Sequence, residues 1–234
     1  MKKAILFDMD GVLYDSMPNH AYAWSHAMTQ FGLTMTAHEA YLHEGRTGGG
    51  TIDILARRAW GRDATDEEKQ RIYKAKVECF NSRPEAKPML GALEALSAAQ
   101  SMGCKIVVVT GSATVSLLER LEASFPGFFH KELMVTAFDV EHGKPHPEPY
   151  LMGLQKAGVS AEEAIVVENA PLGVQAAHAA GIYCIAANTG PLEDRILREA
   201  GADVVVRGME PVADLLRHLS AGTVDRRSVT RDEV

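Results

Sequence analysis

Residues 90–219 alternate between helical and strand patterns, and this alternation limits the fold more than any other feature of the sequence. Short apolar runs of strand length, such as Ile106–Val109, follow longer amphipathic stretches that stop at a glycine, such as Gly103. Strands that alternate with helices form βαβ units, whose right-handed crossovers build a parallel sheet. The strands expected are 3–8, 105–109, 133–136, 165–167, 183–187 and 204–206, and the helices expected are 90–102, 113–124, 147–157, 172–180, 192–200 and 212–219.

The stretch between the first strand and Pro84 carries helical patterns and no convincing strand. Thr65 is suited to cap a helix, because three acidic residues follow it in the first turn. Gly45–Gly50 is expected to be a loop, and Pro84 is expected to follow the end of the last helix. The helices expected here are 20–31, 36–43, 52–60 and 65–80.

Together these patterns predict an α/β protein, in which a doubly wound parallel sheet carries an inserted all-helical domain. The α/β core is expected to comprise residues 1–15 and 84–220, and the helical insert residues 16–83. Residues 221–234 are poor in apolar side chains and mix both charges, so we expect a disordered tail there.

Composition and charge narrow the range of partners. The formal net charge of -7 argues against a nucleic-acid-binding surface. The three cysteines are far apart in the sequence, which favours buried reduced thiols over disulfides or a zinc site. The apolar run near the N-terminus ends at Asp8, and no other run is long enough to span a bilayer. We therefore expect a cytoplasmic monomer that binds neither nucleic acid nor membranes.

Polar side chains lie where two of the expected strands end. Asp8 and Asp10 come after the first strand and precede Gly11, while Glu168 and Asn169 follow another strand. In a parallel sheet the carboxyl ends of the strands meet at one edge, where ligands bind. Adjacent carboxylates are costly unless a cation lies between them or one carries a proton, which favours a functional role for Asp8 and Asp10. The alternative for these two residues is a polar turn that caps the strand end. The four side chains make an all-oxygen set that suits Mg²⁺.

Two further segments offer groups that bind anions. Thr110-Gly111-Ser112 follows the strand 105–109 and combines hydroxyl and backbone N–H groups at the expected start of a helix, a pattern equally consistent with an ordinary helix cap. Lys144 lies in a loop restrained by prolines and could supply a fixed cation, although such segments are commonly surface turns. An anion site beside a Mg²⁺ site indicates phosphoryl transfer, because that reaction depends on positioning and charge neutralisation.

In this order and spacing the four motifs resemble the haloacid dehalogenase superfamily of phosphohydrolases. The motifs are Asp8–Val12, Thr110–Ser112, Lys144–Pro145 and Glu168–Asn169. The resemblance implies a Rossmann-like core and makes the helical insert a cap domain of the family's first type. Further segments resemble the β-phosphoglucomutase-like subfamily: Asp15-Ser16, His20, Trp24 and Ala170–Gly173.

The resemblance implies a role for each motif. Asp8 would be the nucleophile that forms an aspartyl-phosphate, and Asp10 would be the general acid and base, for which its pKa should be raised. Thr110 and Lys144 would hold the transferring phosphoryl group, together with the neighbouring Gly111 and Ser112. Mg²⁺ would bind Asp8, the backbone oxygen of Asp10, Glu168 and Asn169.

Two positions depart from the usual pattern of the family. Asn169 stands where the last motif usually has an aspartate, so one negative charge is missing. Glu44 lies near the place where the sugar-phosphate mutases of the subfamily tend to have a lysine. We expect Glu44 to ligate Mg²⁺ and to replace the missing charge, the alternative being a solvated loop residue. The combination resembles the inorganic pyrophosphatase branch of the subfamily.

Three more residues of the insert are candidate substrate contacts. Arg46 could grip a second phosphate, or it could pair with Glu44 or Glu39 at the surface. Lys76 falls where the subfamily keeps a substrate lysine, although a solvated helix face would explain it equally well. His20 lies near the hinge of the insert, where relatives couple cap closure to Asp10, although a structural histidine is the simpler reading.

These residues favour a Mg²⁺-dependent phosphohydrolase that acts on a small phosphorylated molecule, with pyrophosphate as the first candidate. The alternative is a hexose-phosphate mutase or a sugar phosphatase, which His20 and Lys76 support. A non-catalytic phosphate-binding module is the third hypothesis, and the presence of Asp8, Asp10 and Lys144 argues against it.

Overall fold

The computed structural model describes residues 1–111 and 117–220. Ser112, the expected start of the helix 113–124 and the expected tail 221–234 lie outside the described residues. Six strands form one sheet in the order β3-β2-β1-β4-β5-β6, and every neighbouring pair is parallel. The strands are β1 Ala4–Phe7, β2 Lys105–Val109, β3 Met134–Val135, β4 Ala164–Glu168, β5 Tyr183–Asn188 and β6 Val204–Arg207.

The strand β1 lies at the centre of the sheet, and all four of its residues are buried. Ile5 and Phe7 belong to one hydrophobic cluster, whereas Ala4 and Leu6 belong to a second. This alternation places the two clusters on opposite faces of the sheet. β1 pairs with β2 on one side and with β4 on the other, so successive strands are added to opposite sides of β1. Asp8 follows β1 at this switch point, where open parallel sheets commonly bind ligands.

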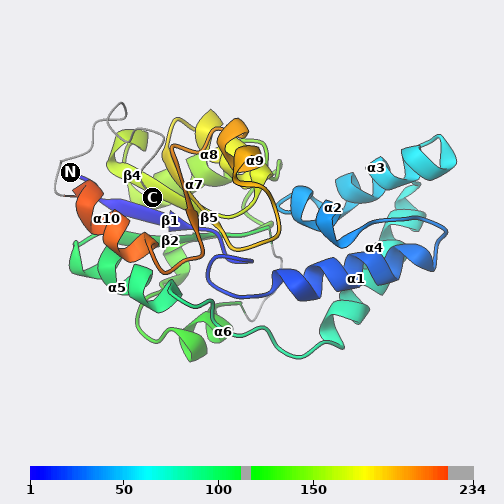
Figure 1. The fold of residues 1–234 in the computed structure, drawn as a ribbon, viewed down its shortest axis with the longest axis horizontal. Coiled ribbons are helices and arrows are strands. Elements are labelled where there is room, and N and C mark those ends of the chain that lie inside the picture. Colours follow the sequence, from blue (N-terminus) through cyan, green and yellow to red (C-terminus); the bar gives the residue numbers. More distant parts are fainter. Residues whose placement is uncertain (112–116, 221–234) are drawn as a thin grey trace.

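Helices cover both faces of the sheet (Figure 1). The helices α5 Ala92–Ser101, α6 Leu117–Ser124 and α10 Val212–Ser220 contribute to the first cluster. The second cluster contains residues of α7 Glu148–Ala157, α8 Pro171–Ala179 and α9 Asp194–Glu199. The expected doubly wound parallel sheet is therefore confirmed.

Four helices are inserted between β1 and α5 and lie together at one end of the molecule (Figure 1). A third hydrophobic cluster holds the insert together, with Met28, Ile52 and Ile72 among its buried members. Thr65 accepts the backbone N–H of Glu68, which confirms the cap expected there, and the Glu68 side chain completes a capping box. We keep 16–83 as the proposed extent of the cap. The helices are α1 Met17–Thr29, α2 Ala37–Leu42, α3 Gly48–Trp60 and α4 Asp66–Asn81.

Several expected boundaries differ from the structure, and a side-chain hydrogen bond explains two of them. The segment Gly45–Gly50 is a loop only in its first half, because the Thr47 side chain accepts the N–H of Gly50 and starts α3 at Gly48. The strand expected over 133–136 shortens to β3, because the N–H of Thr136 is bonded to Asp139 instead of a neighbouring strand. In both places a side chain accepts a hydrogen bond from a backbone N–H and so moves the boundary of the helix or strand.

The remaining expectations concern cysteines and membranes. All three cysteines are free thiols, and Cys104 and Cys184 are buried whereas Cys79 is half-buried. Within the described ranges no helix has both the length and the apolar character required to cross a membrane.

Close packing of α7 on the sheet depends on Gly153. A Cβ at this position would lie 2.7 Å from Leu6 Cδ2 and 3.3 Å from Val109 Cγ2. We expect Gly153→Ala to lower the free energy of unfolding by about 1–3 kcal/mol, because the core must shift to admit the methyl group. Urea denaturation measures the change.

Gly49→Ala is the matched control, since Gly49 is also helical but a Cβ there would meet only Lys69 Cδ, at 3.7 Å. Alanine favours a helix over glycine by up to about 1 kcal/mol, so this variant should be neutral or slightly stabilised. Equal stability of the two variants would contradict the packing argument.

Candidate active site

The turn that follows β1 brings its carboxylates to the edge of the sheet. The N–H of Asp8 continues the ladder by donating to Val167 O at 3.0 Å. Gly11 then adopts a positive φ of 85°, and a Cβ there would lie 2.1 Å from Asn169 Nδ2. Glycine is therefore required at this position, both for the turn and for the close approach to Asn169.

A buried ammonium group connects the two central carboxylates. Lys144 Nζ donates to an oxygen of Asp8 and to Glu168 Oε1, the latter at 2.6 Å. All three side chains are at least nine-tenths buried, so the surface-turn alternative for Lys144 is wrong. Burial by itself would lower the pKa of Lys144, but the two carboxylates outweigh it and raise that pKa. Burial raises the pKa of Asp8 to about 8, with Lys144 offsetting only part of the effect.

Glu168 is held by groups on several elements. Tyr150 on α7 donates its hydroxyl to Glu168 Oε1 at 2.9 Å, and the N–H groups of Asn169 and Ala170 donate to Oε2 at 2.8 and 3.0 Å. A Cβ at Gly173 would lie 1.7 Å from Oε1. Sequence reasoning missed Tyr150 and the packing role of Gly173, since neither residue type signals a contact to Glu168.

The insert contributes a carboxylate to the same place. Asn169 Nδ2 donates to Glu44 Oε2 at 3.1 Å, a contact between residues 125 positions apart. Burial raises the pKa of Glu44 well above its usual range, and repulsion by Asp8 and Glu168 adds to the effect. The alternative of a solvated loop residue is therefore wrong for Glu44.

Two oxygens at this contact lack a partner among the described residues. Glu44 Oε1 and Asn169 Oδ1 are buried and accept no hydrogen bond. A buried acceptor without a hydrogen bond costs free energy. A hard divalent cation can satisfy such acceptors, because it binds sets of oxygen ligands. The donor set and its excess of negative charge thus fit Mg²⁺.

Asp10 lies beside a histidine and a serine. Ser16 Oγ donates to Asp10 Oδ1 at 2.6 Å, and His20 Nε2 lies 3.4 Å from the same oxygen. Burial would raise the pKa of Asp10, but His20, Ser16 and Lys76 together lower it. The raised pKa expected for an acid at this position is therefore wrong, because that expectation left out the contacts from α1.

An aromatic cage surrounds Lys76 on α4. Its ammonium lies 5.3 Å from the ring centre of Trp24, 5.2 Å from that of Phe80 and 5.9 Å from that of Tyr73, and 2.9 Å from His20 Nδ1. Lys76 is only 6 % exposed, so the solvated-face alternative is wrong. Burial lowers the pKa of Lys76 to about 8, although Asp10 acts in the opposite direction.

The other predicted site residues are placed as follows. Arg46 has a buried Nε without a partner in the described parts of the chain, while Glu39 pairs with Arg58. Thr110 is buried and its N–H donates to Val135 O at 2.9 Å. Gly111 is exposed at the end of β2, immediately before the segment that contains Ser112.

Comparisons with known proteins identify a family and several relatives of this chain. Residues 2–181 match the haloacid dehalogenase-like hydrolase family. Hexitol phosphatase A of Escherichia coli (strain K12) is 33% identical over 90% of this chain and 93% of its own length. A phosphorylated carbohydrates phosphatase of Thermotoga maritima is 32% identical, over 89% and 95%. A solved structure from Bacteroides vulgatus, named "Putative beta-phosphoglucomutase", is 54% identical, with a TM-score of 0.91 over 96% of this chain and 91% of that one.

The caged lysine makes stability depend on pH. Below about pH 8 Lys76 carries its charge in both the folded and the unfolded state, so the cost of burying the charge is fully present. As the pH rises from about 8 towards the ordinary value of 10.5, the folded state loses the proton first and stability increases. We expect Lys76→Met to stabilise the protein by about 1–2 kcal/mol at neutral pH and to remove this increase.

Urea denaturation of the wild type and of the variant between about pH 7 and 10 gives the difference. Lys74→Met is the control, because Lys74 lies on the same helix with its side chain 77% exposed, and its pH profile should match that of the wild type. A Lys76→Met profile parallel to that of the wild type would overturn the prediction.

Proposed function

Because this chain belongs to the haloacid dehalogenase-like hydrolase family, we propose that it is a Mg²⁺-dependent phosphohydrolase with Asp8 as its nucleophile. The observation that carries the proposal is the position of Asp8. It ends the central strand at the switch point of the sheet, and Lys144 holds one of its oxygens. A carboxylate fixed in this way can attack phosphorus while the ammonium group offsets the negative charge of the approaching phosphate.

Two buried oxygens without a described hydrogen-bond partner, Glu44 Oε1 and Asn169 Oδ1, support a choice of groups that would hold the metal. Mg²⁺ would lie among the side chains of Asp8, Glu168, Asn169 and Glu44 and the backbone oxygen of Asp10. When bound, it would supply positive charge to the transferring phosphoryl group. Tyr150 and the N–H groups of Asn169 and Ala170 donate hydrogen bonds to Glu168 and would fix its orientation as a metal ligand.

In the first step Asp8 forms a bond to phosphorus, and the bond from phosphorus to the leaving oxygen breaks. The leaving oxygen takes a proton from Asp10, which is ionised in the free protein and would take up that proton when the negatively charged phosphate binds beside it and raises its pKa. His20 lies beside Asp10 Oδ1 and would orient this carboxyl group. In the second step Asp10 accepts a proton from water as the water oxygen attacks phosphorus. The bond between Asp8 and phosphorus then breaks, releasing phosphate and restoring Asp8.

Phosphorylated sugars or sugar alcohols are the first substrate candidates. Their support is similarity, since the Escherichia coli and Thermotoga maritima relatives are named as phosphatases of hexitol phosphates and phosphorylated carbohydrates. The name of the Bacteroides vulgatus structure adds hexose-phosphate mutation as a variant of the same chemistry. In that variant the aspartyl-phosphate passes its phosphoryl group to a sugar hydroxyl instead of water.

Pyrophosphate is a second candidate, and two features of the insert favour it. Glu44 reaches Asn169, where it would hold the metal and occupy space that a sugar would otherwise need. Arg46 carries a buried N–H donor without a described partner, which suits a second phosphate group. The names of the similar proteins favour a phosphorylated carbohydrate as the substrate. The case for pyrophosphate therefore rests on Glu44 and Arg46.

A substrate panel distinguishes these candidates. Phosphate release with Mg²⁺ is measured from hexitol phosphates, hexose phosphates, glycerol phosphate and pyrophosphate, and β-glucose 1-phosphate is also followed for conversion to glucose 6-phosphate. We expect Mg²⁺-dependent release, highest in kcat/KM for a phosphorylated carbohydrate, and a loss on the order of a thousandfold in Asp8→Asn.

A higher kcat/KM for pyrophosphate than for every ester would replace the first candidate with the second, and rapid isomerisation would identify a mutase. Undiminished turnover in Asp8→Asn would refute the proposed nucleophile for all of them.

The role of Glu44 can be tested without substrate. We expect Mg²⁺ at about one hundred times its dissociation constant to stabilise the wild type by about 2.7 kcal/mol. Glu44→Gln should weaken Mg²⁺ binding roughly tenfold or more, because it removes a negatively charged ligand. Thermal unfolding across a Mg²⁺ titration measures both effects.

Glu39→Gln is the matched control, since Glu39 is also a glutamate of the insert but pairs with Arg58 at the surface. Its Mg²⁺ titration should match that of the wild type. An unchanged Mg²⁺ affinity in Glu44→Gln would remove Glu44 from the metal site.

A further inference from the structure

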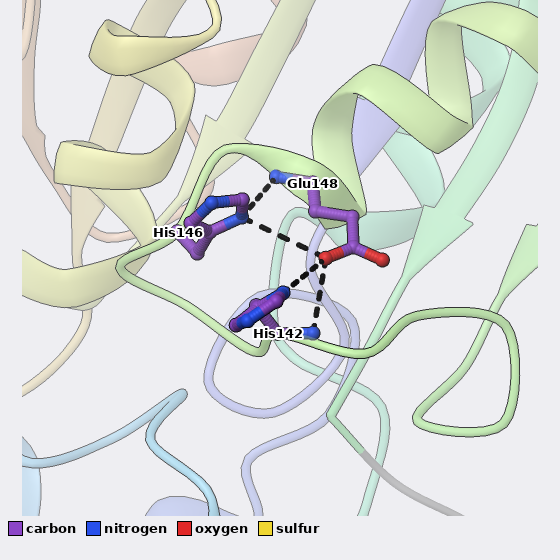
Figure 2. A group of neighbouring side chains, drawn as sticks. All are labelled: His142, His146 and Glu148. Atoms are coloured by element: carbon purple, nitrogen blue, oxygen red, sulfur yellow. Dashed lines mark hydrogen bonds and ion pairs between the residues drawn. The ribbon is translucent and has the colours of Figure 1, made fainter.

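A cluster of two histidines and one glutamate lies on the loop that leads into α7 (Figure 2). His142 Nδ1 lies 2.9 Å from Glu148 Oε2, and His146 Nδ1 lies 3.7 Å from the same oxygen. One ligand atom from each side chain falls within 4.8 Å of the other two. His142 and His146 belong to the loop that carries Lys144, but none of the three side chains of the cluster takes part in the proposed reaction.

The carboxylate of the cluster is fixed in place by the backbone. The N–H of Glu141 donates to Glu148 Oε1 at 2.8 Å, and the N–H of His142 donates to Oε2 at 3.0 Å. These bonds, that of Glu141 foremost, hold the pKa of Glu148 below its usual range and keep the group ionised. The N–H groups therefore act as outer partners that orient a charged ligand.

The spacing of the three groups suits a small divalent ion. In a tetrahedral site with bonds of about 2.0–2.1 Å, neighbouring ligand atoms lie about 3.3 Å apart. The two separations from Glu148 Oε2, 2.9 and 3.7 Å, lie on either side of that value. His146 Nδ1 accepts the N–H of Glu148 at 3.2 Å, so its ring must turn to present this nitrogen to an ion. The side chains of His142 and His146 are 62% and 51% exposed, which leaves room for such rotations. The same exposure leaves the fourth position open to water.

We infer that His142, His146 and Glu148 form a second cation site, suited to Zn²⁺ or a similar transition-metal ion and separate from the Asp8 centre. Two imidazoles and one carboxylate favour Zn²⁺, Ni²⁺ or Cu²⁺ over Mg²⁺, which prefers oxygen ligands and retains its water. The inference does not depend on the proposed function, because none of the three residues belongs to that site.

An ion bound at this site would restrain the loop that carries Lys144. His142 and His146 lie two residues before and two residues after Lys144, whose ammonium group reaches Asp8 and Glu168. An ion bound to both imidazoles and to the first turn of α7 closes this loop into a ring. Occupancy should therefore stabilise the folded state, as any ligand that binds only the folded chain does.

Binding is tested on the full chain with saturating Mg²⁺, so that the all-oxygen centre is already filled. Isothermal titration with Zn²⁺ should give one site per chain in the wild type. We expect the double variant His142→Ala/His146→Ala to lose this site and Glu148→Gln to bind roughly 10- to 100-fold more weakly. His130→Ala is the control, because His130 is another exposed histidine outside the cluster, and it should bind Zn²⁺ as the wild type does.

A spectroscopic measurement on the wild type needs no substitution. Electron paramagnetic resonance of one equivalent of Cu²⁺ should show coupling to imidazole nitrogens, which the all-oxygen centre cannot supply. Two outcomes would overturn the site: equal Zn²⁺ uptake by the wild type and the double histidine variant, or a Cu²⁺ spectrum without nitrogen coupling. In either case the three side chains would serve only to order the loop through hydrogen bonds.

Discussion

The buried ammonium group of Lys144 between Asp8 and Glu168 is the interaction on which the rest of the structure depends. Two carboxylates at adjacent strand ends would repel each other in a dry environment, and Lys144 makes their proximity tolerable. The balance is incomplete, since Glu44 adds a third carboxylate to the same space, where burial and its acidic neighbours keep its pKa high. The raised pKa values of Asp8 and Glu44 mean that the centre holds protons on its carboxyl groups. A divalent cation bound there would replace these protons, which is why this set of oxygen ligands suits one.

The helical insert is part of this centre and not a separate attachment to it. Glu44 bonds to Asn169, a Cβ at Gly45 would lie 3.1 Å from Lys144 Cδ, and His20 lies beside Asp10. The insert therefore contributes a carboxylate, packing and an imidazole to an edge of the sheet that already holds the nucleophile candidate. Its own aromatic cage keeps Lys76 close to the same network, at a cost in stability that a purely structural helix would avoid.

The sequence predicted the sheet and the meeting of its strand ends well, because both follow from local patterns: buried strands are apolar, and parallel strands end at one edge. Asp8, Glu168 and Asn169 could be grouped in this way before any coordinates, whereas Lys144 joined them through the family resemblance. Tyr150 could not, since its contact with Glu168 depends on how α7 is rotated about its axis. The lowered pKa of Asp10 was missed for a similar reason, because the competition between burial and the groups on α1 depends on distances that spacing does not supply. Helix starts such as Gly48 depend on single capping bonds and are equally hard to read.

The contact between Glu44 and Asn169 has a consequence for the order of events. One residue comes from the insert and the other from the end of β4, so a cation held by both would be a tie between two parts of the chain. Metal affinity and closure then share one coupling free energy: whatever opens the insert weakens the metal by the same factor by which the metal resists opening. Release of phosphate past the insert would in that case weaken binding of the cation as well. The enzyme would then be able to exchange its metal once in each turnover.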